Sequence, residues 1–329
     1  MNYSSKDITP SYTQESHFEQ VINAQAAELW QNRQEGFIKS HDKTRLFWAA
    51  LTSESHDKAI VVVNGRIECC WKYQELFYDL FQQGYDVYSF DHRGQGLSDR
   101  LIEPEQMGHV SEFDDYIHDM HAVLESFPLA RYQKRYLLAH SMGGTIATRY
   151  VQHYPTHGFR ALSLSAPMYG INMPSHLRPI ALPLAVVLTN ISSQPTYAPG
   201  HQAYFPKPFE NNPLSQSEVR YRWFRALYET KPQLKIGGPS TRWVWQGILA
   251  AKQCILHTRQ INLPLLVLQA SEDTIVSNPA QIKFIKKLAN SNTQCGFKII
   301  HGAKHEILFE RDEYRNQALD AILYFFSQH

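Results

Sequence analysis

A single serine stands where a short apolar run meets a helical pattern, and this junction restricts the fold more than any other stretch. The run 136–139 leads into the letters AHSMGG, which contain Ser141, and a helix is expected over 145–153. A strand, a sharp turn and a helix in this order hold the serine in a strained backbone conformation and lift its hydroxyl above the sheet. The small residues around it let the strand and the helix pass close together. Ala139 replaces the first glycine of the usual G-x-S-x-G pattern.

Apolar runs of strand length alternate with helical patterns along most of the chain. Strands are expected at 59–63, 85–90, 136–139, 161–165, 263–269 and 296–300, and helices at 73–83, 113–127, 145–153, 279–288 and 311–326. The continuous β-branched run at 59–63 is typical of a parallel strand that is covered on both faces. This order predicts an α/β fold with a mostly parallel, doubly wound sheet.

The alternation stops in the middle of the chain, where prolines cluster among short helical patterns. We interpret this part as an inserted helical cap over the carboxyl edge of the sheet. The chain start has apolar residues at helical spacing, from Phe18 to Leu29, and is expected to pack on the main domain. The predicted parts are an N-terminal extension, a main α/β domain in two segments and the cap: residues 1–33, 34–167 with 246–329, and 168–245.

Composition limits the partners and the location. The net charge of +1 over 329 residues argues against an extended nucleic-acid surface, which would be distinctly basic. The N-terminus lacks a basic segment followed by an apolar run, so no signal peptide is expected. No stretch approaches the roughly 18 to 20 apolar residues of a membrane span. We therefore expect a cytoplasmic protein, with contact to the inner face of the membrane left open.

An acid and a histidine follow the serine in the order that a catalytic triad requires. A serine hydroxyl becomes a nucleophile when a histidine takes its proton and a buried carboxylate orients that histidine. Asp273 follows the strand at 263–269, and His305 follows the strand at 296–300. Both positions lie at carboxyl ends of strands, the edge that also carries Ser141. The sequence therefore predicts Ser141, Asp273 and His305 as the catalytic residues.

Alternative interpretations of these residues stay open. Asp273 could instead cap the turn before the next helix, with Glu272 as the fallback acid. His140 is expected to be structural because it is adjacent to the serine and points another way. His92 and His301 are weaker candidates for the base because of their positions.

Two backbone N–H groups are expected to form the oxyanion hole. One belongs to Met142, the residue after the nucleophile. The other belongs to Arg66, in the turn after the strand at 59–63, where Gly65 permits a close backbone approach; a plain glycine turn is the alternative. The loop Gly94-Gln95-Gly96 lacks the third glycine of a dinucleotide site, so that interpretation is rejected.

These motifs resemble the monoacylglycerol-lipase-like, or serine aminopeptidase-type, branch of the α/β-hydrolases. Within that branch they are most similar to the bacterial inner-membrane-associated lysophospholipases. The similarity covers the chain from about Glu15 onward. The matching segments are DHRGQGLS at 91–98, AHSMGG at 139–144, GAKHEILFE at 302–310, NGRIE at 64–68 and IGGPS at 236–240.

The resemblance implies an α/β-hydrolase catalytic domain and a serine esterase that hydrolyses the acyl ester of lysophospholipids. The products would be a free fatty acid and a glycerophosphodiester, formed through an acyl-enzyme. Two departures bear on this. Asn64-Gly65 stands where monoacylglycerol lipases have histidine-glycine, which favours the lysophospholipases. Asp273 stands where some members of that subgroup carry glutamate.

Other functions fit the same residues. A monoacylglycerol lipase or a general carboxylesterase would share the triad and differ only in its pocket. An aminopeptidase would need a carboxylate cluster for the substrate amine, and the acidic residues of the cap, Glu210, Glu218 and Glu229, are too scattered. A catalytically inactive hydrolase fold acting as a binding protein is the alternative from another class.

The predicted cap contains features that suit a monoacyl lipid substrate. The uncharged apolar stretch 179–188 could line an acyl channel, dip into a membrane surface or simply pack on the main domain. Arginines could meet a phosphate, or form a solvated face: Arg178, Arg220, Arg222, Arg225 and Arg242. The sequence implies no metal and no organic cofactor.

Overall fold

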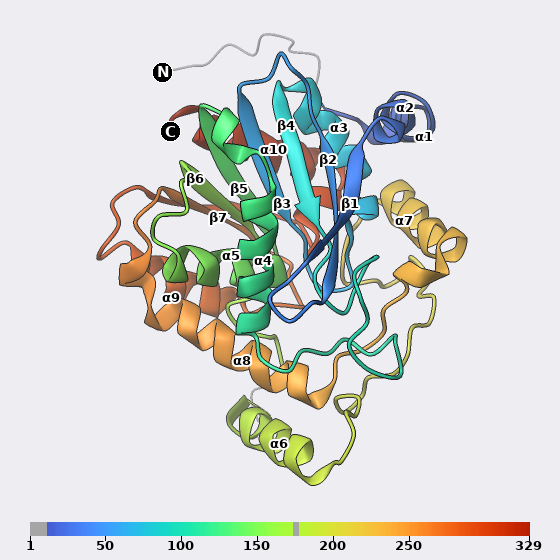
Figure 1. The fold of residues 1–329 in the computed structure, drawn as a ribbon, viewed down its shortest axis with the longest axis vertical. Coiled ribbons are helices and arrows are strands. Elements are labelled where there is room, and N and C mark those ends of the chain that lie inside the picture. The colour runs from blue at the N-terminus through green and yellow to red at the C-terminus, as the bar shows by residue number, and fades with distance from the viewer. Residues whose placement is uncertain (1–11, 174–177) are drawn as a thin grey trace.

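One sheet crosses the whole molecule and carries helices on both faces (Figure 1). The computed structural model describes residues 12–173 and 178–329, and within them the sheet has eight strands in the order β1-β2-β4-β3-β5-β6-β7-β8. β2 pairs antiparallel with β1 and with β4, and the other neighbouring pairs are parallel. The strands are β1 (Gln34–Lys39), β2 (Arg45–Leu51), β3 (Lys58–Val63), β4 (Tyr85–Phe90), β5 (Lys134–His140), β6 (Ala161–Ser165), β7 (Leu265–Ala270) and β8 (Cys295–Ile300).

The helices divide between the two faces of the sheet. Side chains of α4, α5, α8 and α9 share one buried apolar cluster with the sheet, and those of α3 and α10 share the other. The predicted α/β fold with a mostly parallel, doubly wound sheet is therefore confirmed. The helices are α1 (Phe18–Asn23), α2 (Gln25–Gln31), α3 (Gln74–Gln82), α4 (Asp114–Ser126), α5 (Met142–His153), α6 (Arg178–Ile191), α7 (Glu218–Thr230), α8 (Thr241–Leu256), α9 (Asn278–Leu288) and α10 (Asp312–Ser327).

β3 shows why its sequence is a continuous β-branched run. Val61 and Val63 belong to the cluster on one face, while Ile60 and Val62 belong to the cluster on the other. Side chains alternate between the faces of a strand, so a strand covered on both faces must be apolar at every position. Each such side chain stabilises the fold by about 1.5–3 kcal/mol.

The N-terminal helical pattern forms two short helices that meet at Ala24, whose φ and ψ of −121° and −90° are not helical. The break lets the two helices pack on different partners. Phe18 of α1 contacts Trp223 of α7, whereas Trp30 of α2 packs edge-on against Trp71 and Phe77. Residues 1–11 of the predicted extension lie outside the described residues.

The predicted cap contains α6, α7 and the start of α8 (Figure 1). α8 runs through position 245, where the sequence analysis ends the cap, and its later turns belong to the core of the main domain. The three-part division of the chain stays a prediction. None of the helices in the described ranges combines the length and apolar character that crossing a bilayer requires.

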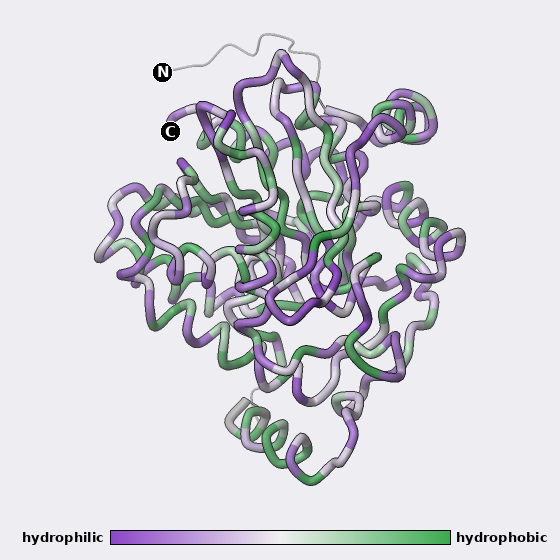
Figure 2. Tube along the Cα trace, in the orientation of Figure 1, coloured by the Kyte–Doolittle hydropathy of each residue, from purple (hydrophilic) through white to green (hydrophobic). Residues whose placement is uncertain are grey.

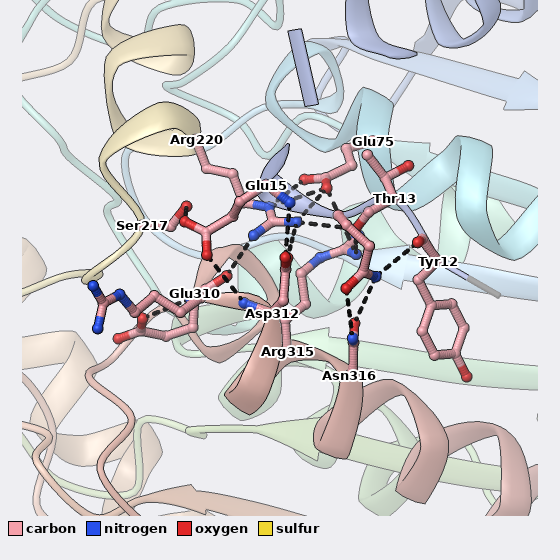
Figure 3. A network of polar contacts seen from close by, with 12 residues as sticks. Tyr12, Thr13, Glu15, Glu75, Ser217, Arg220, Glu310, Asp312, Arg315 and Asn316 are labelled. Carbon is pink, nitrogen blue, oxygen red and sulfur yellow. Dashed lines mark hydrogen bonds and ion pairs between the residues drawn. The ribbon is translucent and has the colours of Figure 1, made fainter. Parts of the chain in front are cut away.

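A buried ion network ties α7 to the main domain (Figure 3). The guanidinium of Arg220 is fully buried and lies 2.8 Å from Glu75 of α3 and 2.8 Å from Asp312 of α10. It also donates a hydrogen bond of 3.1 Å to the carbonyl of Thr13. Arg220 therefore does not belong to a solvated face, and it does not line the cavity described below.

We predict that Arg220→Met lowers the free energy of unfolding by about 3–5 kcal/mol. The variant removes the guanidinium that is hydrogen-bonded to the buried Glu75 and leaves it only Arg315, at 3.6 Å. Urea unfolding measures the change. The matched control is Arg222→Met, on the exposed face of the same helix and paired with Glu218; it should change the free energy by less than about 1 kcal/mol. Equal effects of the two variants would contradict a special role for the buried network.

Candidate active site

Ser141 occupies a sharp turn between β5 and α5. Its φ and ψ are 52° and −117°, a backbone conformation that L residues rarely adopt, and α5 begins at the next residue, Met142. The helix thus starts earlier than the predicted 145–153. A Cβ on Gly143 would lie 2.2 Å from the carbonyl oxygen of Val63, so only glycine lets α5 start this close to the end of β3.

The structure brings the three predicted catalytic side chains into one hydrogen-bonded chain. Nε2 of His305 lies 2.9 Å from Oγ of Ser141, and Nδ1 of His305 lies 2.7 Å from Oδ2 of Asp273. All three residues are buried, with at most 8% of their surface exposed. Each follows a parallel strand at its carboxyl end, which is why residues so distant in sequence meet.

The carboxylate of Asp273 binds His305 and also stabilises its own turn. Its second carboxylate oxygen accepts hydrogen bonds from the backbone N–H groups of Ile275 and Val276, at 2.8 and 3.0 Å. Burial alone would raise the pKa of Asp273, but the interaction with His305 and these N–H donors outweigh it and hold the pKa below its usual value. Glu272, the fallback acid, is exposed and accepts a hydrogen bond from Ser271.

The other histidines near the site are held by backbone carbonyls. Nδ1 of His140 lies 3.0 Å from the carbonyl oxygen of Ser165, and Nε2 of His92 lies 2.9 Å from that of Asn64. Both rings are buried, and burial lowers the pKa of His92 to about 4, so this ring stays neutral. His301 is exposed.

The turn after β3, predicted to supply an oxyanion donor, is braced from several sides. The N–H of Gly65 donates to the carboxylate of Glu68 at 2.5 Å, and the side chain of Gln95 donates to the carbonyls of both residues. Among the described residues, neither the N–H of Arg66 nor that of Met142 has a hydrogen-bond partner. Both residues line the same cavity as Ser141, so two unpaired donors stand near the nucleophile.

A buried lysine connects this turn to the loop that carries His305. Nζ of Lys72 lies 2.9 Å from Glu68 and 2.7 Å from Glu306, and only 1% of Lys72 is exposed. Burial would raise the pKa of Glu68, but Lys72 and His140 outweigh it and lower the pKa to about 2. This cluster was not predicted from the sequence, although the i, i+4 spacing of Glu68 and Lys72 and the position of Glu306 beside His305 are signals of it.

A cavity of about 900 Å³ opens above Ser141 and His305. Its walls come largely from the predicted cap and are mostly apolar; they include Leu188 of α6, Phe224 of α7 and Trp243 of α8. Asp273 does not line the cavity and stands behind His305. An apolar cavity of this size with a few polar groups at its floor is typical of a small-molecule site.

Comparison with known proteins identifies the family. The model of the serine aminopeptidase S33 family matches residues 54–312, which is most of the chain. The chain belongs to this family. The resemblance to the monoacylglycerol-lipase-like, serine aminopeptidase-type branch is therefore confirmed.

Relatives of this S33 hydrolase match it over most of their lengths. Lysophospholipase L2 of Escherichia coli (strain K12) is 37% identical over 323 residues, which cover 96% of this chain and 94% of the relative. The probable lysophospholipase L2 of Haemophilus influenzae is 39% identical over 82% of this chain and 83% of the relative. A soluble variant of monoglyceride lipase from Saccharomyces cerevisiae, solved with a substrate analog, has the same fold, with a TM-score of 0.69 at 17% identity over 90% of this chain and 96% of that chain.

Among the described residues of the S33 hydrolase, one group offers several possible metal ligands. Ligand atoms of His41, Asp115 and His118 lie within 4.8 Å of one another. Asp115 already lies 3.5 Å from the guanidinium of Arg93, and none of the three residues lines the cavity. This group is separate from the candidate active site.

The Lys72 cluster predicts a pH-dependent stability. The folded-state pKa of Glu68, about 2, lies below its usual value of 4.5, so its stabilisation is present above pH 4.5 and is lost as the pH falls toward 2. We expect Glu68→Gln to be less stable than the wild type by on the order of 3 kcal/mol at about pH 7, with the gap narrowing toward about pH 3.

Urea unfolding at several pH values measures this gap. Glu28→Gln, at an exposed position of α2, is the control for the same substitution elsewhere. A gap for Glu68→Gln that stays constant with pH would contradict the stabilisation of the Glu68 carboxylate.

Proposed function

We propose that this chain is a serine esterase that hydrolyses the single acyl ester of lysophospholipids, releasing a free fatty acid and a glycerophosphodiester. The observation that carries the proposal is the unbroken hydrogen-bonded chain from Ser141 through His305 to Asp273 at the floor of a largely apolar cavity. The two relatives named as lysophospholipases support the substrate class, because they match 96% and 82% of this chain.

In the proposed mechanism, Oγ of Ser141 attacks the acyl carbonyl while Nε2 of His305 takes the hydroxyl proton. Asp273 accepts the Nδ1–H hydrogen bond, which orients the ring and stabilises its charged form. The N–H groups of Arg66 and Met142 donate to the developing oxyanion. The ester bond then breaks, and His305 returns its proton to the leaving glycerol oxygen. Water, activated by the same histidine, cleaves the acyl-enzyme and releases the fatty acid.

The decisive measurement compares wild type and Ser141→Ala on a lysophospholipid and on a monoacylglycerol with the same acyl chain, following free fatty acid. We expect the wild type to prefer the lysophospholipid and the variant to lose on the order of 10⁴-fold or more in kcat on both. A preference for the monoacylglycerol would contradict the proposed substrate class but not the catalytic triad.

Labelling with a fluorophosphonate probe separates enzyme from binding protein. The expected adduct forms on Ser141 in the wild type and is absent in Ser141→Ala. A folded wild type with neither an adduct nor turnover would favour a catalytically inactive binding protein.

We further propose that the protein is cytoplasmic and contacts the inner face of the membrane through α6. Four large apolar side chains lie along one side of this helix and are exposed: Ile180 (50%), Leu184 (44%), Val187 (53%) and Ile191 (73%). Figure 2 shows that α6 is mainly hydrophobic along its length. Because Ile180 and Leu184 also line the cavity, this surface adjoins the substrate path. An exposed apolar helix face of this kind suits a lipid interface.

We predict that the double variant Val187→Glu with Ile191→Glu binds less to vesicles of phosphatidylcholine and phosphatidylglycerol in a sedimentation assay. Two charges on the exposed face oppose insertion into the apolar layer. The matched control is Leu256→Glu at the end of α8, an equally exposed apolar position outside α6. If both proteins bind vesicles like the wild type, α6 is not the contact surface.

A further inference from the structure

The side chain of Arg66 reaches into the cavity from the turn after β3 without an acidic partner. Its Nη1 donates one hydrogen bond of 3.0 Å to the carbonyl of Gly237, and its guanidinium lies over the ring of Trp243 at 5.3 Å. In the described part of the chain, no carboxylate lies within ion-pair distance of it. By contrast, the buried cations Lys72 and Arg220 are both paired with carboxylates.

An uncompensated guanidinium in such a place favours an anionic ligand. Burial lowers the pKa of Arg66 to about 10, so the group remains charged at neutral pH. Arg66 is half-buried, and a charge partly withheld from water without a counter-ion raises the free energy of the folded protein. An anion in the cavity offsets that cost and accepts the remaining N–H donors.

The segment that orients Arg66 is one that the sequence analysis singled out, Ile236-Gly237-Gly238-Pro239-Ser240. A Cβ on Gly237 would lie 2.6 Å from the carbonyl oxygen of Gln202, and a Cβ on Gly238 would lie 2.4 Å from the side chain of His201. The two glycines therefore let the strip around residues 201–204 pack directly behind the carbonyl that holds Arg66.

A second cation, Lys207, lies near His201 together with Arg66. The pKa of His201 is lowered by burial and then by the charges of Arg66 and Lys207, and all three residues line the cavity. Lys72 also lines the cavity, and Glu68 and Glu306 neutralise its charge. Of these cations, Lys72 is therefore paired with carboxylates, and Arg66 is not.

Arg225 is the other arginine along the cavity wall, and its charge already has partners. Its guanidinium lies 4.9 Å from the ring of Tyr221 and 5.0 Å from that of Phe224. Burial alone would lower the pKa of Arg225, but Tyr221, Tyr228 and the negative charge of Glu306 outweigh it and raise the pKa. Arg66 is therefore the better receptor for an anion.

We propose that the guanidinium of Arg66 binds the phosphate of the substrate, making the turn after β3 a phosphate subsite. The inference rests on the proposed lysophospholipase function and names its head-group contact.

A lysophospholipid carries its phosphate one three-carbon glycerol away from the acyl ester. Arg66 offers its backbone N–H near Ser141 and its guanidinium one side-chain length away. A single residue then contacts both the reacting carbonyl and the phosphate. Guanidinium groups bind phosphate oxygens in pairs, which adds orientation to affinity.

The test is the ratio of kcat/KM for a lysophospholipid to that for a monoacylglycerol with the same acyl chain. Arg66→Met keeps the backbone N–H and removes the charge, and we expect it to lower the ratio on the order of tenfold to a hundredfold. Arg66→Lys keeps the charge without the planar fork and should fall between Arg66→Met and the wild type. Arg222→Met, exposed and outside the cavity, should keep the wild-type ratio.

A second measurement tests whether the subsite binds free phosphate as well as a lipid head group. It follows the inhibition of monoacylglycerol hydrolysis by inorganic phosphate. Inhibition that weakens in Arg66→Met supports the subsite even if the wild type does not hydrolyse lysophospholipid, in which case only the proposed function falls. If Arg66→Met lowers activity on both substrates equally and phosphate inhibits it like the wild type, the phosphate subsite is overturned while the lysophospholipase function stands.

Discussion

The active-site edge depends on one close contact between main chains, where the first turn of α5 lies against the end of β3. Gly143 makes it possible, since a Cβ there would lie 2.2 and 2.4 Å from the carbonyl oxygens of Val63 and Asn64. Ser141 takes up the strain of the turn with its positive φ, a conformation that costs about 1–3 kcal/mol. The backbone of Ser141 is bonded to Ser165 on the neighbouring strand, which holds that conformation in place. The turn after β3 can therefore face the nucleophile.

Charged side chains around the site differ in whether a carboxylate compensates them. Lys72 bridges Glu68 and Glu306, so the turn after β3 and the loop of His305 share one cation. Arg220 does the same for α7, α3 and α10 (Figure 3). Arg66 departs from this rule, because its single hydrogen bond goes to a carbonyl. Lys72 and Arg220 are thus compensated by carboxylates, whereas Arg66 faces the cavity with no carboxylate of the described residues within ion-pair distance.

The sequence predicts what depends on local pattern and strand order. The apolar runs locate the strands, and the carboxyl ends of parallel strands must share one edge, so Ser141, Asp273 and His305 could be brought together without coordinates. The start of α5 at Met142 could not be predicted in this way. It depends on the close contact of Gly143, which follows β5, with Val63 at the end of the neighbouring strand β3.

Ion pairs between residues that are distant in the chain could not be predicted from the sequence either. Arg220 could be suggested only as one of several arginines, since its partner Glu75 lies 145 residues away. No periodicity connects such positions, and only the packing of α7 on the main domain decides that their charges meet.

The two helical walls of the cavity, α6 and α7, are held by different kinds of interaction. The α7 wall is fixed to the main domain by the buried ion pairs of Arg220 and by the hydroxyl of Tyr228, which donates to the carbonyl of Ile67 at 2.6 Å. The α6 wall packs against α8 and keeps its outer face in solvent. Moving α7 would break buried charge pairs, whereas no ion pair of the described residues holds α6 to the main domain. We therefore expect a ligand that needs more room to displace α6 before α7, so that α7 sets the position of the ligand relative to Ser141.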